Sequence, residues 1–152
     1  MHEYEKIITS LQLEPHPEGG WFKRVFPADG DDSFGISTIY YLLEGEDFSS
    51  FHRLHGLTEI WYHQAGCALD IHVIKADGTL VTHHLEPGGQ MQAAIEPESW
   101  FAAEIPGKEG FVLVGCAVAP AFGYESFELA TKESLLKEFP QHSSLITRLC
   151  RQ

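Results

Sequence analysis

The sequence predicts an all-β protein, a sandwich or barrel of short strands with a short helical segment at each end. Short runs rich in β-branched and aromatic residues alternate with turns that contain glycine, proline and aspartate, which is typical of such folds. Apolar residues with helical spacing occur near the two termini. With 152 residues and 43% hydrophobic content, the chain is long enough for one globular domain, which we expect to span residues 1–152.

The helices are expected outside the run of strands. A short amphipathic helix is predicted over residues 3–13, stopped by the prolines that begin at Pro15. At the other end, Thr131 can cap a helix that Pro140 terminates, and residues 145–149 suggest one or two further turns. The expected strands lie between these helices, at residues 21–26, 36–43, 69–74, 80–85, 91–95, 100–105 and 111–118.

Charge and cysteine usage exclude several classes of protein. The net charge of -12 argues against a nucleic-acid or anionic-membrane partner, which would require a basic patch. Cys67, Cys116 and Cys150 have neither the number nor the spacing of a disulfide framework or a zinc knuckle, so we expect reduced thiols and a cytoplasmic location. The first residues have no apolar signal core, and the apolar run at residues 111–122 is too short to span a bilayer as a helix.

The stretch at residues 51–66, FHRLHGLTEIWYHQAG, contains the most unusual pattern. Glu59, Trp61 and His63 fall on one face of a strand, because side chains alternate with period two. A strand that only fills a core would carry apolar residues at these positions. We therefore expect Glu59 and His63 to line a cavity that is connected to solvent.

The order of histidines, glutamate and glycine in this stretch resembles the first motif of the cupin superfamily, H-x-H-x(3,4)-E-x(6)-G. The half from Glu59 to Gly66 fits fully. In the other half, His52 as the first histidine leaves Leu54 in the second slot, and His55 as the second leaves Arg53 in the first.

Further segments resemble one branch of that superfamily, small proteins described as predicted sugar epimerases. They are HPEGGWF, FHRL with a downstream EIW, WFAAE, LVGCAVAPAF followed by FEL, and FPQH, and they span about residues 15–142. The resemblance implies a cupin double-stranded β-helix, a jelly-roll-type barrel. Its pocket would open at the barrel mouth, ringed by His52, Glu59, Trp61, His63 and Trp100.

The resemblance also defines where a metal would bind. Cupin metals usually take histidines and a glutamate from the first motif and a histidine from a second motif, P-x-G-x-x-H. Here Ala102 occupies the position of that histidine and has no donor atom. We expect no metal cofactor; if a divalent metal binds, its ligands would be His52, Glu59 and His63, since imidazole and carboxylate both suit such ions.

Without a metal, His52 and Glu59 are candidates for an acid–base pair, since histidine titrates near neutrality and a nearby carboxylate orients its ring. The resemblance implies proton abstraction beside the carbonyl of a sugar or nucleotide sugar, with a histidine as base and a tyrosine as acid, for which Tyr40 is the first choice. A turn or bulge at residues 55–57 is needed, because seven residues separate His52 from Glu59. The alternative for His52 is a structural hydrogen bond to the backbone.

Several residues are candidates for binding the ligand. Trp61 and Trp100 could stack on a sugar or base ring, although tryptophans in strands more often belong to the core, and His55 is expected at the pocket rim. Arg24 and Arg53 could bind an anionic group of a substrate or pair with surface acids, and we favour the second role.

The expected partner is a small-molecule ligand. A non-catalytic ligand-binding cupin and a metal-dependent cupin enzyme remain alternatives to the isomerase. We also expect a homodimer, because the strand at residues 21–26 is apolar on both faces and has an edge to pair.

Overall fold

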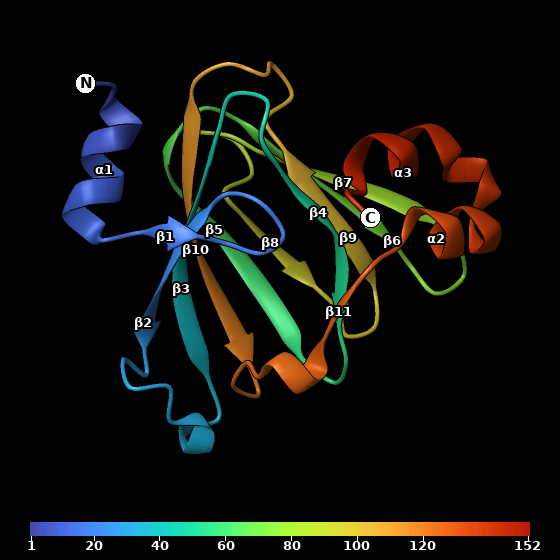
Figure 1. Cartoon of the computed structure of the whole chain (residues 1–152), viewed down its shortest axis with the longest axis horizontal. Coiled ribbons are helices and arrows are strands. Elements are labelled where there is room, and N and C mark those ends of the chain that lie inside the picture. The colour runs from blue at the N-terminus through green and yellow to red at the C-terminus, as the bar shows by residue number, and fades with distance from the viewer.

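The computed structural model of the chain describes residues 1–152, apart from the side chain of Asp32, and consists of two antiparallel sheets packed face to face (Figure 1). The six-stranded sheet has the order β1 (Glu14–Pro15), β2 (Trp21–Phe26), β3 (Ser37–Glu44), β10 (Phe111–Ala119), β5 (Thr58–Gly66), β8 (Gln92–Ile95). The five-stranded sheet has the order β11 (Phe127–Leu129), β4 (Phe48–Leu54), β9 (Trp100–Glu104), β6 (Leu69–Ile74), β7 (Leu80–Leu85). The predicted all-β sandwich with short terminal helices is confirmed.

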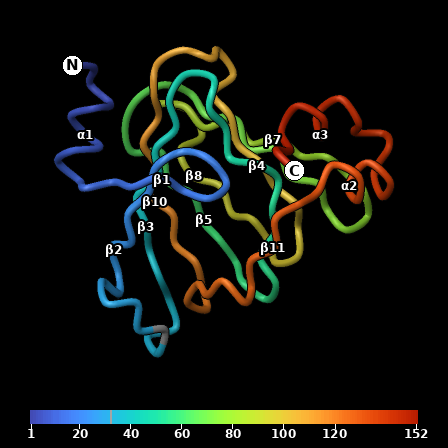
Figure 2. The backbone as a smooth tube through the Cα atoms, in the orientation of Figure 1, coloured from blue at the N-terminus to red at the C-terminus, as the bar shows by residue number. Residues whose placement is uncertain are grey.

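Helices cover the outer faces of both sheets. The helix α1 (Glu3–Leu11) packs on the six-stranded sheet, whereas α2 (Lys132–Glu138) and α3 (Ser143–Leu149) pack on the five-stranded sheet, so the two termini lie on opposite sides of the sandwich (Figure 2). The short 3-10 turns are η1 (Asp32–Phe34), η2 (Tyr124–Ser126) and η3 (Pro140–His142). In the described part of the chain, no helix is long and apolar enough to cross a membrane.

The first helix ends two residues before the predicted boundary. Gln12 adopts a left-handed conformation with φ 57°, and its backbone N–H bonds to carbonyls of the last helical turn. The chain therefore leaves the helix before Pro15 can stop it.

The main core lies between the two sheets. Trp61 on β5 and Phe101 on β9 meet there at nearly perpendicular ring planes, with 6.3 Å between their centroids. A second apolar cluster joins the outer face of the five-stranded sheet to α2 and α3. Because β9 lies between these two clusters, its residues are buried on both sides.

The turn between β4 and β5 has the predicted position, at residues 55–57. Gly56 has φ 73°, a conformation that glycine adopts without steric cost. The turn sends β4 and β5 into different sheets. His52 and Glu59 therefore face the space between the sheets from opposite sides. Their odd separation of seven residues would point them to opposite faces of a single strand, but it does not do so here because they lie in different sheets.

Candidate functional site

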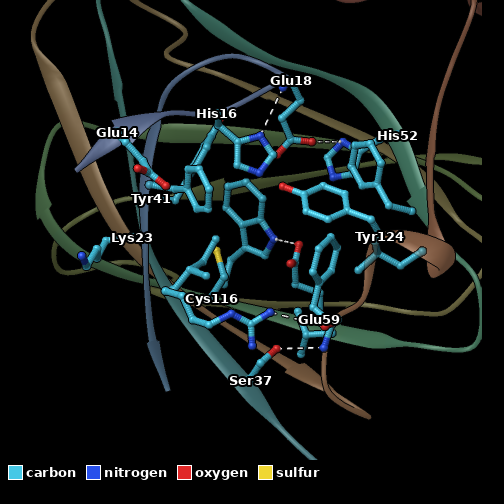
Figure 3. A pocket seen from close by; sticks show the side chains of 18 of the residues that line it. Glu14, His16, Glu18, Lys23, Ser37, Tyr41, His52, Glu59, Cys116 and Tyr124 are labelled. Atoms are coloured by element: carbon cyan, nitrogen blue, oxygen red, sulfur yellow. Dashed lines mark hydrogen bonds and ion pairs between the residues drawn. The ribbon is translucent and has the colours of Figure 1, made fainter. Parts of the chain in front are cut away.

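One end of the space between the sheets is an open cavity of about 450 Å³ (Figure 3). Both sheets contribute its walls, with side chains from β2, β3, β5 and β10 on one side and from β4 on the other. The loop that carries His16 and Glu18 closes one flank, and Tyr124 on η2 lies at the exposed rim. A volume of this size is within the usual range for small-molecule sites.

His52 and Glu18 form a buried ion pair in the wall of this cavity. The Nδ1 atom of His52 lies 2.8 Å from Oε2 of Glu18 and 2.8 Å from the carbonyl oxygen of Ser50. Both neighbours can only accept, so Nδ1 carries a hydrogen; it is directed at the Ser50 carbonyl, and the contact with Glu18 is mainly electrostatic. This arrangement leaves Nε2 of His52 free to act on a ligand.

The pair also shifts the pKa of each partner. Burial by itself lowers the pKa of His52, but the close carboxylate of Glu18 outweighs burial, so the pKa is raised. Burial by itself raises the pKa of Glu18, but the close charge of His52 outweighs this, so the pKa is lowered. Both shifts favour the imidazolium–carboxylate form.

His16 lies beside this pair in a different protonation state. The backbone N–H of Glu18 donates to Nδ1 of His16 over 3.1 Å, which places the hydrogen of the neutral ring on Nε2. Burial lowers the pKa of His16, and the nearby charge of His52 lowers it further, whereas the charge of Glu18 raises it. His16 is therefore a neutral hydrogen-bond donor at the cavity wall.

Glu59 faces the cavity from the opposite sheet. Its Oε1 accepts a hydrogen bond of 2.7 Å from Nε1 of Trp61. Burial raises the pKa of Glu59 to about 7; the charge of Glu18 adds to this effect, and the charge of His52 and the Trp61 hydrogen bond oppose it. A carboxyl group that is partly ionised at neutral pH can both give and take a proton.

The tyrosine in the cavity wall is Tyr41. Tyr40, the tyrosine expected from the sequence, does not line the cavity. Neighbouring residues of a strand point to opposite faces, and Tyr40 packs outward near α1 while Tyr41 faces inward. The Tyr41 hydroxyl donates to the carbonyl of Gly19 over 2.5 Å. Burial raises its pKa well above 10, and the charge of Glu18 adds to the shift, so Tyr41 remains a phenol.

His63 has the predicted orientation but does not line the cavity. It is buried on the same strand face as Glu59 and Trp61, and its Nε2 lies 2.8 Å from the carbonyl of Cys67. The cavity occupies the end of β5 near Glu59, and four residues of strand place His63 about 13 Å farther along. The prediction is therefore wrong for His63, whereas Glu59 and Trp61 do line the cavity.

Trp100, Arg53 and His55 lie outside the cavity as well. Trp100 belongs to the cluster under the C-terminal helices, because it points to the outer face of the sheet, and the Arg53 guanidinium stacks 4.3 Å from the centre of its ring. Arg53 also donates to Glu128 over 2.9 Å. His55 is exposed between Glu98 and Glu128, at 2.5 and 2.7 Å.

The donor groups of the cavity do not fit the metal site that the cupin resemblance implies. Among the described residues, no group of three or more histidine, cysteine, aspartate or glutamate side chains is arranged to hold a metal. Phe101 faces inward, with its ring centroid 4.1 Å from that of His52, and Ala102 faces the helices instead. Neither Phe101 nor Ala102 therefore supplies a donor atom beside His52.

Sequence reasoning missed Glu18, Tyr41 and Cys116, which line the cavity with His52 and Glu59. For His16, the HPEGG segment suggested a place at the mouth of the pocket, and His16 does line the cavity. That segment was the available signal for Glu18, since a carboxylate between a histidine and two glycines in a loop is free to fold over a pocket.

Three comparisons relate the chain to known proteins. Residues 5–130 match the model of the family Cupin_5, described as Cupin superfamily (DUF985). The chain is 34% identical to protein SO0799 from Shewanella oneidensis, with a TM-score of 0.87 and 99% of each chain covered. It is 29% identical to a hypothetical protein from Leishmania major, with a TM-score of 0.87, over 99% of this chain and 100% of that one. No curated protein matches.

More distant structures share the fold. The oxalate decarboxylase of Bacillus subtilis, which has Mn(II) centres, is 16% identical with a TM-score of 0.63, over 93% of this chain and 38% of that one. An oxalate oxidase in complex with the substrate analogue glycolate is 13% identical with a TM-score of 0.60, over 88% of this chain and 72% of that one. At these identities the likeness concerns the fold alone.

Proposed function

Since the chain belongs to the Cupin_5 family of the cupin superfamily, we propose that it is an epimerase-like or isomerase-like enzyme that moves a proton beside the carbonyl group of a small, sugar-like substrate. The observation that carries this proposal is the placement of Glu59 and His52 on opposite sides of one cavity, where burial raises the pKa of Glu59 to about 7. Titratable groups in one pocket with pKa values shifted toward neutrality are typical of acid–base catalysis.

The environments of Glu59 and His52 suggest their roles. The ionised fraction of Glu59 would take a proton from the carbon next to the carbonyl, and the electron pair of that C–H bond would form the double bond of an enolate. The pKa of His52 is raised by Glu18, so its Nε2–H would donate to the enolate oxygen. A proton delivered to the opposite face of the carbon completes an epimerisation. If the Glu59 carboxyl first exchanges its proton with solvent, delivery to either face places a solvent hydrogen on the carbon.

This assignment differs from the one that the resemblance implied, in which a histidine was the base and a tyrosine the acid. Here Glu59 is the base and His52 is the acid. The hydroxyl of Tyr41 already donates to Gly19, and its pKa is raised well above 10. We therefore give Tyr41 a role in shaping the cavity next to Gly19.

Exchange of carbon-bound hydrogen for solvent deuterium tests the proposal. Candidate keto-sugars are incubated with the protein in D₂O, and loss of the signal next to the carbonyl is followed by proton NMR. Glu59→Gln should slow exchange at least about 100-fold, the usual contribution of a general acid or base. The exposed Glu109→Gln is the matched control and should exchange at the wild-type rate. Equal rates in Glu59→Gln and the wild type would contradict the proposal.

A non-catalytic ligand-binding cupin is the second candidate. The aromatic rings of Phe22, Trp61 and Phe127 in the cavity wall favour it, because such rings bind the apolar faces of sugars or bases without any proton transfer. Native mass spectrometry of the purified protein separates the two functions: a retained small molecule together with no exchange in any keto-sugar would favour simple binding.

A metal-dependent enzyme is the third class. Elemental analysis of the purified protein decides it, and we expect far less than one transition metal per chain because Phe101 stands beside His52. A value near one, lost in His52→Ala and Glu59→Ala, would replace the proposed mechanism.

A further inference from the structure

Arg24 is the one arginine in the cavity wall, and its guanidinium has an unused donor. Its Nη1 is buried and has no hydrogen-bond partner, while Nη2 donates to the carbonyl of Phe122 over 3.4 Å. The strand β2 supplies both Arg24 and Lys23 to the wall, and Lys23 lies at the exposed side (Figure 3). The strand β2 therefore contributes two cationic side chains to the cavity wall.

The other arginines have carboxylate partners. Arg53 pairs with Glu128, Arg148 with Glu104 and Arg151 with Asp47. Among the side chains that the structure describes, no carboxylate lies within 4.0 Å of the Arg24 guanidinium. A buried cationic donor without a partner is unfavourable, and such groups are kept where a ligand completes them.

We infer that the ligand of this cavity carries an anionic oxygen group, a carboxylate or a phosphate, that binds to Arg24. A planar guanidinium presents parallel donors to such a group, and no protein acceptor competes for Nη1. The carbonyl of the same molecule would then reach Glu59 and His52 in the rest of the cavity; this part of the inference rests on the proposed function. The substrate class becomes an acidic sugar derivative, a sugar acid or a sugar phosphate.

The overall charge of the protein does not explain a preference for anionic ligands. The net charge is -12, and the cavity wall itself contains Glu14, Glu18 and Glu59, so the average field repels anions. A local contact is required, and Arg24 is placed to make it.

Isothermal titration with three probes tests the inference. D-glucuronate and D-glucose 6-phosphate carry the two kinds of anion, and D-glucose is their uncharged counterpart. We expect at least one anionic probe to bind about tenfold or more tightly than D-glucose, and Arg24→Gln to remove that difference. The anion that gains affinity identifies the group. Anionic probes that bind no better than D-glucose would overturn the inference.

Two variants control for loss of charge and for folding. Arg53→Gln removes the same charge outside the cavity and should keep the preference for the anion; an equal loss in both variants would mean a general charge effect and would refute a site at Arg24. If Arg24 had only a structural role, Arg24→Gln would lower the melting temperature of the ligand-free protein. We expect that temperature to stay equal or rise, because the variant removes a buried donor atom that has no partner in the protein.

The two proposals fail separately. Binding of an anion through Arg24 without deuterium exchange in any keto-sugar would end the proposed function and keep the anion site. Exchange in an uncharged keto-sugar with no preference for anionic probes would do the reverse.

Discussion

At the scale of single residues, the pKa values of Glu59 and Glu18 shift in opposite directions, although burial raises both and both groups line one cavity. Glu18 has the charge of His52 against its carboxylate, whereas Glu59 has only a hydrogen bond from Trp61 and a more distant charge. The pKa of one is therefore lowered and that of the other raised. This contrast gives the cavity a permanent anion and a group that titrates near neutrality.

The raised pKa of Glu59 predicts a cost in stability at neutral pH. The folded-state pKa of about 7 lies above the ordinary value of 4.5, so the folded protein holds a proton that the unfolded chain releases between these values. Stability is thus lost as pH rises from about 4.5 to 7 and is constant on either side. Glu59→Gln, which imitates the protonated form, should equal the wild type near pH 4.5 and exceed it by up to about 3 kcal/mol at pH 8.

Urea denaturation of both proteins at several pH values measures this difference. Glu109→Gln, in which the exposed glutamate is replaced, should follow the wild type at every pH. A difference between Glu59→Gln and the wild type that does not change with pH would show that Glu59 titrates normally in the folded protein.

At the scale of elements, the periodic patterns predicted most strands but not which face of β3 or β9 is inward. In β3 the run Ile39, Tyr40, Tyr41, Leu42 and Leu43 is apolar throughout, because α1 covers one face and the main core the other. Such a strand carries no alternation to read, so Tyr40 and Tyr41 could not be distinguished. For the same reason, Trp100 and Ala102 on β9 were expected to face the pocket, although they face the helices. The strand β5 alternates in exposure, and the direction of its inward residues was predicted correctly.

The loop that carries Glu18 was not predictable from local patterns, since it is held by contacts far along the chain. Arg151 donates to the carbonyls of Glu18 and Phe48 over 2.5 and 2.7 Å, and the backbone N–H of Gly20 donates to Asp47 over 2.9 Å. These contacts join the first loop of the chain to the turn before β4 and to the C-terminal end. No periodicity in either segment indicates that they meet.

This loop supplies a prediction about Gly19. A Cβ atom at Gly19 would lie 2.0 Å from the carbonyl oxygen of Phe48, and its φ of 113° is unfavourable for any side chain. Gly19→Ala should displace Glu18 from His52, so the pKa of His52 should fall toward its ordinary value and deuterium exchange should slow. NMR titration of the His52 ring measures the first effect.

Gly30→Ala is the matched control for Gly19→Ala. Gly30 also has a positive φ, of 80°, but nothing lies within 4 Å of a Cβ placed there. This variant should lose about 1 kcal/mol through backbone strain and leave the His52 pKa unchanged. An unchanged His52 pKa in Gly19→Ala would show that the loop does not position Glu18.

At the scale of the whole molecule, the sandwich leaves one sheet edge incompletely paired. The edge strand β1 pairs only with Trp21 and Phe22 of β2. Farther along β2, Val25 and Phe26 are 44% and 42% exposed, and α1 does not cover them. An apolar strand with free backbone groups is a surface that proteins cover or pair.

We therefore predict that two copies of the chain associate through β2 as a two-fold dimer, the commonest assembly. Light scattering at micromolar concentration should give about twice 17.0 kDa, and Val25→Asp should reduce the mass to 17.0 kDa because it places a charge in the interface. Leu80→Asp is the control: Leu80 is 37% exposed on β7, the edge strand of the other sheet, and its replacement should leave the dimer intact. A monomeric wild type would refute the dimer, and a dimer broken by Leu80→Asp but not by Val25→Asp would move the interface to the five-stranded sheet.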